Sequence, residues 1–131
     1  MLKSIRIMLA IAAYHDYEIW QMDVKTAFLN GFLEEEVYMS QSEGFVLETK
    51  PNQVCKLKKS IDVLKQASRS WNIQFDKTIK EFDFIKNEDE PCMYKKTSGS
   101  TIVFLVLYVD DILLIENDIP MLQSVKVWLS K

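Results

Sequence analysis

Two adjacent aspartates, Asp110 and Asp111, interrupt the most apolar run of this chain, which reads LYVDDILLI at 107–115. The residues on each side of the pair suit a buried strand, so the economical structure is a β-hairpin with the acids at or beside its turn. Aspartate is also common in ordinary exposed turns. The pair alone therefore fits a simple turn as well as a functional site.

Hydrophobic patterning predicts an α+β fold for the rest of the chain. With 131 residues, 48% of them hydrophobic, it has enough apolar material for one domain, 1–131. The expected elements are a core-facing N-terminal helix, a buried strand ending near Asp23, a short helix with a turn signal at Asn30-Gly31, strands at 36–40 and 54–60, a helix from Leu64 to Phe82, strands at 92–96 and 101–109, the hairpin's second strand, and a helix capped by Asn117 or Asp118. This order predicts an antiparallel sheet with helices packed on one face. Trp71 and Phe75 recur at helical spacing, which favours a core position over base stacking.

Charge is distributed unevenly along the chain. The net charge is −3, yet residues 50–80 contain eight lysines and arginines against two aspartates. Such a segment suits phosphate contact, although a solvated lysine face on a helix gives the same pattern.

Cysteine usage and hydropathy bear on the compartment. Cys55 and Cys92 have neither paired spacing nor a nearby histidine, so neither zinc nor a disulfide framework is predicted. The apolar run 102–115 is shorter than the roughly 20 residues of a bilayer span. The basic and apolar start of the chain also suits a secretory signal, but the core-facing helix is preferred. We expect an intracellular protein, cytoplasmic or nuclear, that is not secreted and does not enter a membrane.

Paired carboxylates in apolar surroundings need a compensating cation, because desolvation and like-charge repulsion both disfavour ionisation. Mg²⁺ is the natural choice, since it prefers hard oxygen ligands. Adjacent residues on a strand point to opposite faces, so at most one of Asp110 and Asp111 faces a given ion unless the turn redirects the other. A partner is needed from elsewhere, and Asp23 at the end of another strand is the candidate.

Four motifs extend this interpretation. The chain contains, in order, QMDVKTAFLNG (21–31), EEEVYM (34–39), VCKLKKS with LKQASRSW (54–71), and LYVDDILLI (107–115). Together they resemble the reverse transcriptase of copia-type LTR retrotransposons. The resemblance implies a polymerase palm with part of the fingers, and RNA-directed DNA synthesis with two Mg²⁺ ions, which Mn²⁺ can replace. The implied partners are an RNA or DNA template-primer and deoxynucleoside triphosphates.

The resemblance also implies roles for individual residues. Asp23, Asp110 and Asp111 match the catalytic metal ligands. The implied nucleotide-binding residues are Val24, Lys25, Thr26, Ala27, Phe28, Lys65 and Tyr108. In that set Phe28 matches the steric gate beneath the incoming sugar, although a core Phe on a short helix is the plainer interpretation. The implied template-primer residues are Val63, Gln66, Arg69 and Val109.

The sequence departs from the family pattern at several positions. Asp62-Val63 stands where the family usually has Tyr-Gly, and Glu116 and Asp83 stand where it commonly has Gly. The fingers are expected to be partial, and the thumb and RNase H domain to be absent. We therefore expect a fragment that keeps its metal carboxylates but has little or no polymerase activity alone. A non-catalytic nucleic-acid-binding remnant of a retroelement is the alternative.

Overall fold

The computed structural model describes residues 2–62 and 64–131, which form two compact units. The first contains residues 2–25 and 76–131, the second residues 26–75, and each is described by itself. Val63, predicted to contact template-primer, lies outside the described residues. The assignment of 1–131 to one partial domain stays a prediction.

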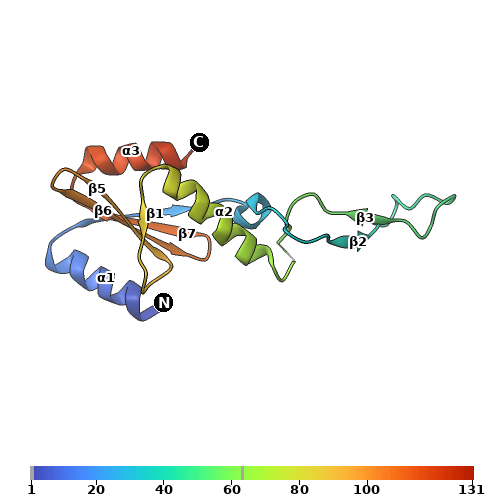
Figure 1. Ribbon diagram of the computed structural model, residues 1–131, viewed down its shortest axis with the longest axis horizontal. Coiled ribbons are helices and arrows are strands. Elements are labelled where there is room, and N and C mark those ends of the chain that lie inside the picture. Colours follow the sequence, from blue (N-terminus) through green and yellow to red (C-terminus); the bar gives the residue numbers. More distant parts are fainter. Residues whose placement is uncertain (1, 63) are drawn as a thin grey trace. The chain divides into compact units, whose positions relative to one another are not determined.

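The first unit is a five-stranded antiparallel sheet with helices, in the strand order β1-β7-β6-β5-β4 (Figure 1). Its elements are α1 (Leu2–Tyr14), β1 (Glu18–Asp23), the end of α2 (Ala67–Glu81), β4 (Ile85–Lys86), β5 (Met93–Ser98), β6 (Thr101–Tyr108), β7 (Asp111–Glu116) and α3 (Ile119–Leu129). The predicted α+β class is confirmed, and so is the hairpin, formed by β6 and β7. Asp118 caps α3 by accepting a hydrogen bond from the backbone N–H of Met121. Among the described helices, none is long and apolar enough to cross a bilayer.

Helices cover both faces of this sheet, and the prediction that they pack on one face is wrong. Met8 and Ala12 of α1 pack against Val106 and Ile115 on one face. On the other face lies Trp20, whose ring is 5.7 Å from Lys126 Nζ of α3. Figure 1 shows α1 and α3 on opposite sides of the strands. The physical reason is that the hairpin strands are apolar on both faces, so each face needs a cover.

Strand β1 lies at an edge of the sheet. It pairs with β7, and no strand among residues 2–62 and 64–131 pairs with its other side. Its residues are exposed or half-buried, so the prediction of a buried strand here is wrong. The apolar composition of this segment does not reveal how many neighbouring strands it has.

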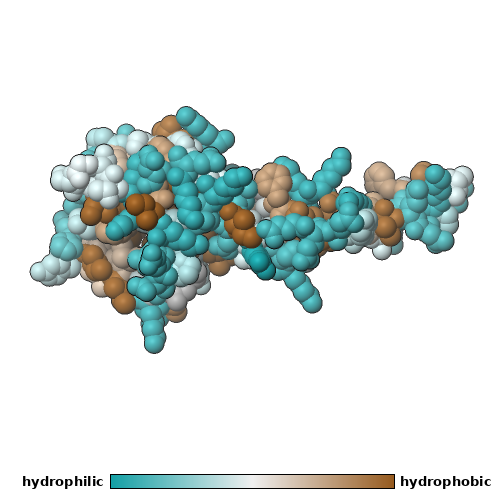
Figure 2. Space-filling view, viewed as in Figure 1, coloured by the Kyte–Doolittle hydropathy of each residue, from teal (hydrophilic) through white to brown (hydrophobic). Residues whose placement is uncertain are grey.

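The second unit contains the 3₁₀ helix η1 (Ala27–Asn30), the antiparallel pair β2 (Tyr38–Ser40) and β3 (Val54–Lys56), and the start of α2. Trp71 and Phe75 are buried, as the helical spacing predicted. Several apolar side chains around β2 and β3 stay exposed, with Phe45 at 79%. Figure 2 shows brown, hydrophobic atoms at this part of the surface among teal ones.

The start of one helix, the end of one strand and one additional strand differ most from the sequence-based expectation. The long helix begins at Ala67 rather than Leu64, because a turn precedes it in which the Ala67 N–H donates to the Leu64 carbonyl. The strand expected over 54–60 ends at Lys56. The two-residue strand β4 was not predicted, since so short a segment has no readable period.

Candidate metal centre

Asp23 and Asp111 face each other across two paired strands. Asp23 is the last residue of β1 and Asp111 the first of β7, and their Cα atoms are partners in the antiparallel register. Directly opposed residues point to the same face of a sheet, so both carboxylates project from one side. Beyond the strand, the Val24 N–H donates to the Asp110 carbonyl at 3.1 Å, which ties the end of β1 to the hairpin turn.

The hairpin turn decides where Asp110 points. Tyr108 and Asp111 pair directly, which leaves Val109 and Asp110 as a two-residue turn. Val109 has a φ of 58°, an unfavourable value for a β-branched residue but one that a tight hairpin turn requires at its first central position. Asp110 lies in the turn and not in a strand, so strand alternation does not send it to the face opposite Asp111. The turn therefore allows Asp110 and Asp111 to face the same ion, a point that the sequence left open.

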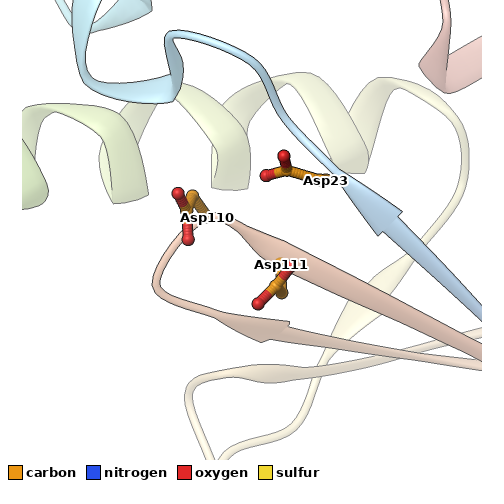
Figure 3. Close-up of side chains that lie close together, drawn as sticks. All are labelled: Asp23, Asp110 and Asp111. Atoms are coloured by element: carbon orange, nitrogen blue, oxygen red, sulfur yellow. The ribbon is translucent and has the colours of Figure 1, made fainter.

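The three carboxylates form one cluster. Asp23, Asp110 and Asp111 each offer an oxygen atom, and these atoms lie within 4.8 Å of one another (Figure 3). Ligand oxygens around one octahedral Mg²⁺ are about 3 Å apart when adjacent and about 4 Å when opposite, given Mg–O bonds of about 2.1 Å. Small side-chain rotations would bring the three oxygens to that spacing. Asp23 is exposed and the other two are half-buried, so a hydrated ion has access from solvent. The donor set fits a hard divalent cation.

A fourth residue contacts this cluster and was missed from the sequence. The Gln21 amide donates a hydrogen bond from Nε2 to Asp111 Oδ1 at 3.2 Å. The available signal was its position two residues before Asp23, which places both side chains on one face of a strand.

Several predicted site residues lie beside the carboxylates in the first unit. Tyr108 is opposite Asp111 in the register, so its side chain shares the face of that carboxylate, and it is 42% exposed. Val109 is the first residue of the hairpin turn, and the Val24 N–H donates a hydrogen bond to the Asp110 carbonyl. Lys25 is exposed at the end of the unit. The roles assigned to them stay predictions.

The other predicted nucleotide and template residues lie in the second unit. Ala27 is buried and Phe28 is half-buried on η1, while Thr26 precedes that helix with a φ of 55°. Gln66 precedes α2, and its backbone carbonyl accepts a hydrogen bond from the Ser70 N–H. Lys65 and Arg69 are exposed, which leaves both cations accessible to an anionic ligand. Their nucleotide and template roles also stay predictions.

Comparison with known proteins settles the family. The sequence model of the family described as "Reverse transcriptase (RNA-dependent DNA polymerase)" matches residues 1–131. The chain belongs to this reverse transcriptase family. It is 47% identical over 129 residues to the retrovirus-related Pol polyprotein from transposon TNT 1-94 of Nicotiana tabacum, a match that covers 98% of this chain and 10% of that protein. The Pol polyproteins from transposons RE1 and RE2 of Arabidopsis thaliana are each 40% identical, over 92% of this chain and 8% of their own length.

These matches confirm the resemblance to copia-type retrotransposon reverse transcriptases that the four motifs indicated. The chain spans about a tenth of the length of these Pol polyproteins. No solved structure matches it.

Proposed function

We propose that this chain supplies the carboxylate centre of an RNA-directed DNA polymerase. The reaction is transfer of a nucleotidyl group from a deoxynucleoside triphosphate to a primer 3′-hydroxyl, with two Mg²⁺ ions that Mn²⁺ can replace. The observation that supports it is the cluster of Asp23, Asp110 and Asp111, whose oxygens lie within 4.8 Å of one another. When bound by these carboxylates, divalent ions would activate the attacking hydroxyl and stabilise the leaving pyrophosphate.

The chain's own residues bind and orient the reactants in this proposal. Asp23 and Asp111 would hold the ions from two hydrogen-bonded strands, and the sheet fixes the spacing of their Cα atoms. Asp110 adds its carboxylate from the turn. Tyr108 and Val109, adjacent to the pair, lie along the primer end. The backbone from Val24 to Ala27 approaches the triphosphate, and the Phe28 ring lies under the sugar and excludes a 2′-hydroxyl.

Partners outside the chain complete the enzyme. We propose that the 131 residues alone extend primers little or not at all, because they span about a tenth of the relatives' length. The other parts of a Pol polyprotein supply further contacts to template, primer and triphosphate. The protein acts inside the cell, in a cytoplasmic particle or in the nucleus.

The first test measures divalent-ion binding by the chain itself. Titration with Mn²⁺, followed by the electron paramagnetic resonance signal of the free ion, should show a site that Asp110→Asn weakens at least tenfold, because one of three charged ligands becomes neutral. Asp89→Asn is the matched control, since Asp89 is an exposed aspartate outside the cluster. Equal Mn²⁺ binding by the wild type and Asp110→Asn would count against the proposal.

The second test measures polymerisation. In an exchanged protein, these 131 residues replace the matching segment of the tobacco polyprotein and so lie within a full-length Pol polyprotein. We expect Mg²⁺-dependent primer extension by the exchanged protein, abolished by Asp110→Asn, and none by the 131 residues alone. Robust synthesis by the 131 residues would refute the claim that they are inactive alone. An exchanged protein that folds but makes no DNA would refute the polymerase assignment.

The exposed cations of the second unit favour one alternative, a nucleic-acid-binding module without chemistry. Lys58, Lys59, Lys65 and Arg69 all reach solvent. Each phosphate that such cations neutralise releases counterions, so binding weakens as salt is raised. Template-primer binding that is salt-sensitive but indifferent to Mg²⁺ and to Asp110→Asn would favour this module over the polymerase.

A further inference from the structure

The edge strand β1 places a long amide side chain diagonally across from Asp111. Gln21 is the register partner of Leu113, and Asp111 lies two residues before Leu113 on β7. Diagonal neighbours in an antiparallel pair are about 7–8 Å apart, a gap that only a long side chain bridges. The Gln21 amide spans it and donates to Asp111 Oδ1 at 3.2 Å.

Burial does not force this hydrogen bond. Gln21 is exposed, so water could satisfy its amide equally well. Asp111 is half-buried, and the next residue on its side of β7 is the apolar Leu113, which offers no hydrogen bond. The amide is the only side-chain donor that contacts the Asp111 carboxylate among the described hydrogen bonds. Removing this hydrogen bond would therefore mainly change the orientation of the Asp111 carboxylate.

A neutral donor suits a carboxylate that must also bind a cation. The terminal torsion of aspartate has a broad, shallow preference, so a hydrogen bond to one oxygen restricts its rotation. An ionised carboxylate has about four acceptor positions, so one bond leaves the others for a metal ion. A lysine or arginine at the same place would bring a positive charge that competes with the ion.

We infer that Gln21 is a positioning residue, which holds the Asp111 carboxylate in the orientation that binds the divalent ion. The inference rests on the proposed function, because it assigns Gln21 to the same metal centre. Hydrogen-bond partners of metal ligands typically change metal affinity 10–100-fold when removed. Because this bond is exposed and 3.2 Å long, we expect an effect near the lower limit.

The test compares two substitutions at Gln21, one that removes the hydrogen-bond donor and one that adds a positive charge. Gln21→Met keeps a long side chain without the amide, and Gln21→Lys places a cation beside Asp111. The control is Gln123→Met, because Gln123 is an exposed glutamine on α3, which covers the opposite face of the sheet. For each variant of the whole 131-residue chain, the Mn²⁺ dissociation constant and the midpoint of thermal unfolding are measured.

We expect Gln21→Met to weaken Mn²⁺ binding about tenfold, Gln21→Lys to weaken it further, and Gln123→Met to leave it unchanged. The unfolding midpoint should stay near that of the wild type, since exposed substitutions usually alter stability by less than about 0.5 kcal/mol.

Three outcomes would overturn the inference. Wild-type affinity in Gln21→Met refutes it, while loss of binding in Asp110→Asn would leave the proposed function intact. A weakening matched by a lower unfolding midpoint assigns Gln21 a merely structural role. Equal Mn²⁺ binding by the wild type and Asp110→Asn would show that these carboxylates do not form a metal centre. It would refute both the proposed function and the inference about Gln21.

Discussion

Replacing Gly31 with alanine should destabilise the second unit, because helix α2 passes directly over this glycine. A Cβ atom at position 31 would lie 2.7 Å from Ser70 Cβ and 3.0 Å from both the Ser70 carbonyl carbon and the Trp71 nitrogen. Non-bonded carbon atoms normally approach to about 3.5–4.0 Å. The atoms in the way are backbone or Cβ atoms, which no rotamer change can move. Either the helix or the segment containing Gly31 must shift.

The magnitude follows from two opposing effects. Inserting a methyl group into a packed site typically costs about 1–3 kcal/mol. The cost is near the upper limit here, because the Gly31 carbonyl also accepts a hydrogen bond from the buried Ser60 N–H at 3.1 Å, which a shift would strain. Alanine lowers the entropy of the unfolded chain, which returns about 0.4–1 kcal/mol. Gly31 has an ordinary φ of −71°, so no backbone strain is added. The net loss is about 1–2.5 kcal/mol, or roughly 4–10 °C in unfolding midpoint.

The assay is urea unfolding followed by circular dichroism and tryptophan fluorescence. Ser70→Gly in the Gly31→Ala background removes the closest clashing atom and should recover part of the loss, whereas Ser70→Ala keeps that atom and should recover none. The pair of single and double variants gives the coupling energy directly. A Gly31→Ala chain as stable as the wild type would show that α2 does not approach Gly31 in this way.

Three further predictions concern stability. Val109→Gly should raise the free energy of unfolding by about 1 kcal/mol, because valine is strained at a φ of 58°. Asp83→Gly should raise it less, since aspartate tolerates its φ of 63° better, and urea midpoints test this order. Burial alone raises the pKa of Asp76, but hydrogen bonds from Lys80 and Tyr94 outweigh it and leave that pKa below its ordinary value. The ionised Asp76 carboxylate therefore stabilises the fold above about pH 4, and this stabilisation is lost as the pH falls through the lower folded pKa. Thermal unfolding between about pH 4 and pH 2 should show a smaller loss of stability in Asp76→Asn than in the wild type. Equal losses in the two proteins would contradict this.

Local patterns were sufficient for most of the fold. The apolar runs around Asp110-Asp111 predicted the hairpin, because the period of strand residues and the turn preference of aspartate are properties of adjacent residues. The amphipathic spacing of Trp71 and Phe75 predicted a helix with a buried face, and both side chains are buried. Asp23 was identified by its place at the end of a strand and by its motif. Its closeness to the hairpin acids then followed from the register of β1 with β7.

Gly31 shows where local patterns mislead. The Asn30-Gly31 pair is typical of a turn that needs positive φ at glycine, yet Gly31 has a φ of −71° and a ψ of 140°. Glycine is required here by the approach of Ser70, 39 residues later in the chain. The dipeptide alone does not distinguish a turn glycine from a contact glycine.

The amino-acid sequence by itself determined most of the elements and their order, the reverse transcriptase family and the three carboxylates, because these depend on neighbouring residues and on motifs. Tertiary structure alone decided that helices cover both faces of the sheet, that β1 is an edge strand, that the turn brings Asp110 near Asp111, and that the Gln21 amide donates a hydrogen bond to Asp111. Each of these depends on the pairing of distant segments, such as the 90 residues that separate Gln21 from Asp111. Strand register and helix packing set such contacts through the balance of the whole core, which no local period encodes.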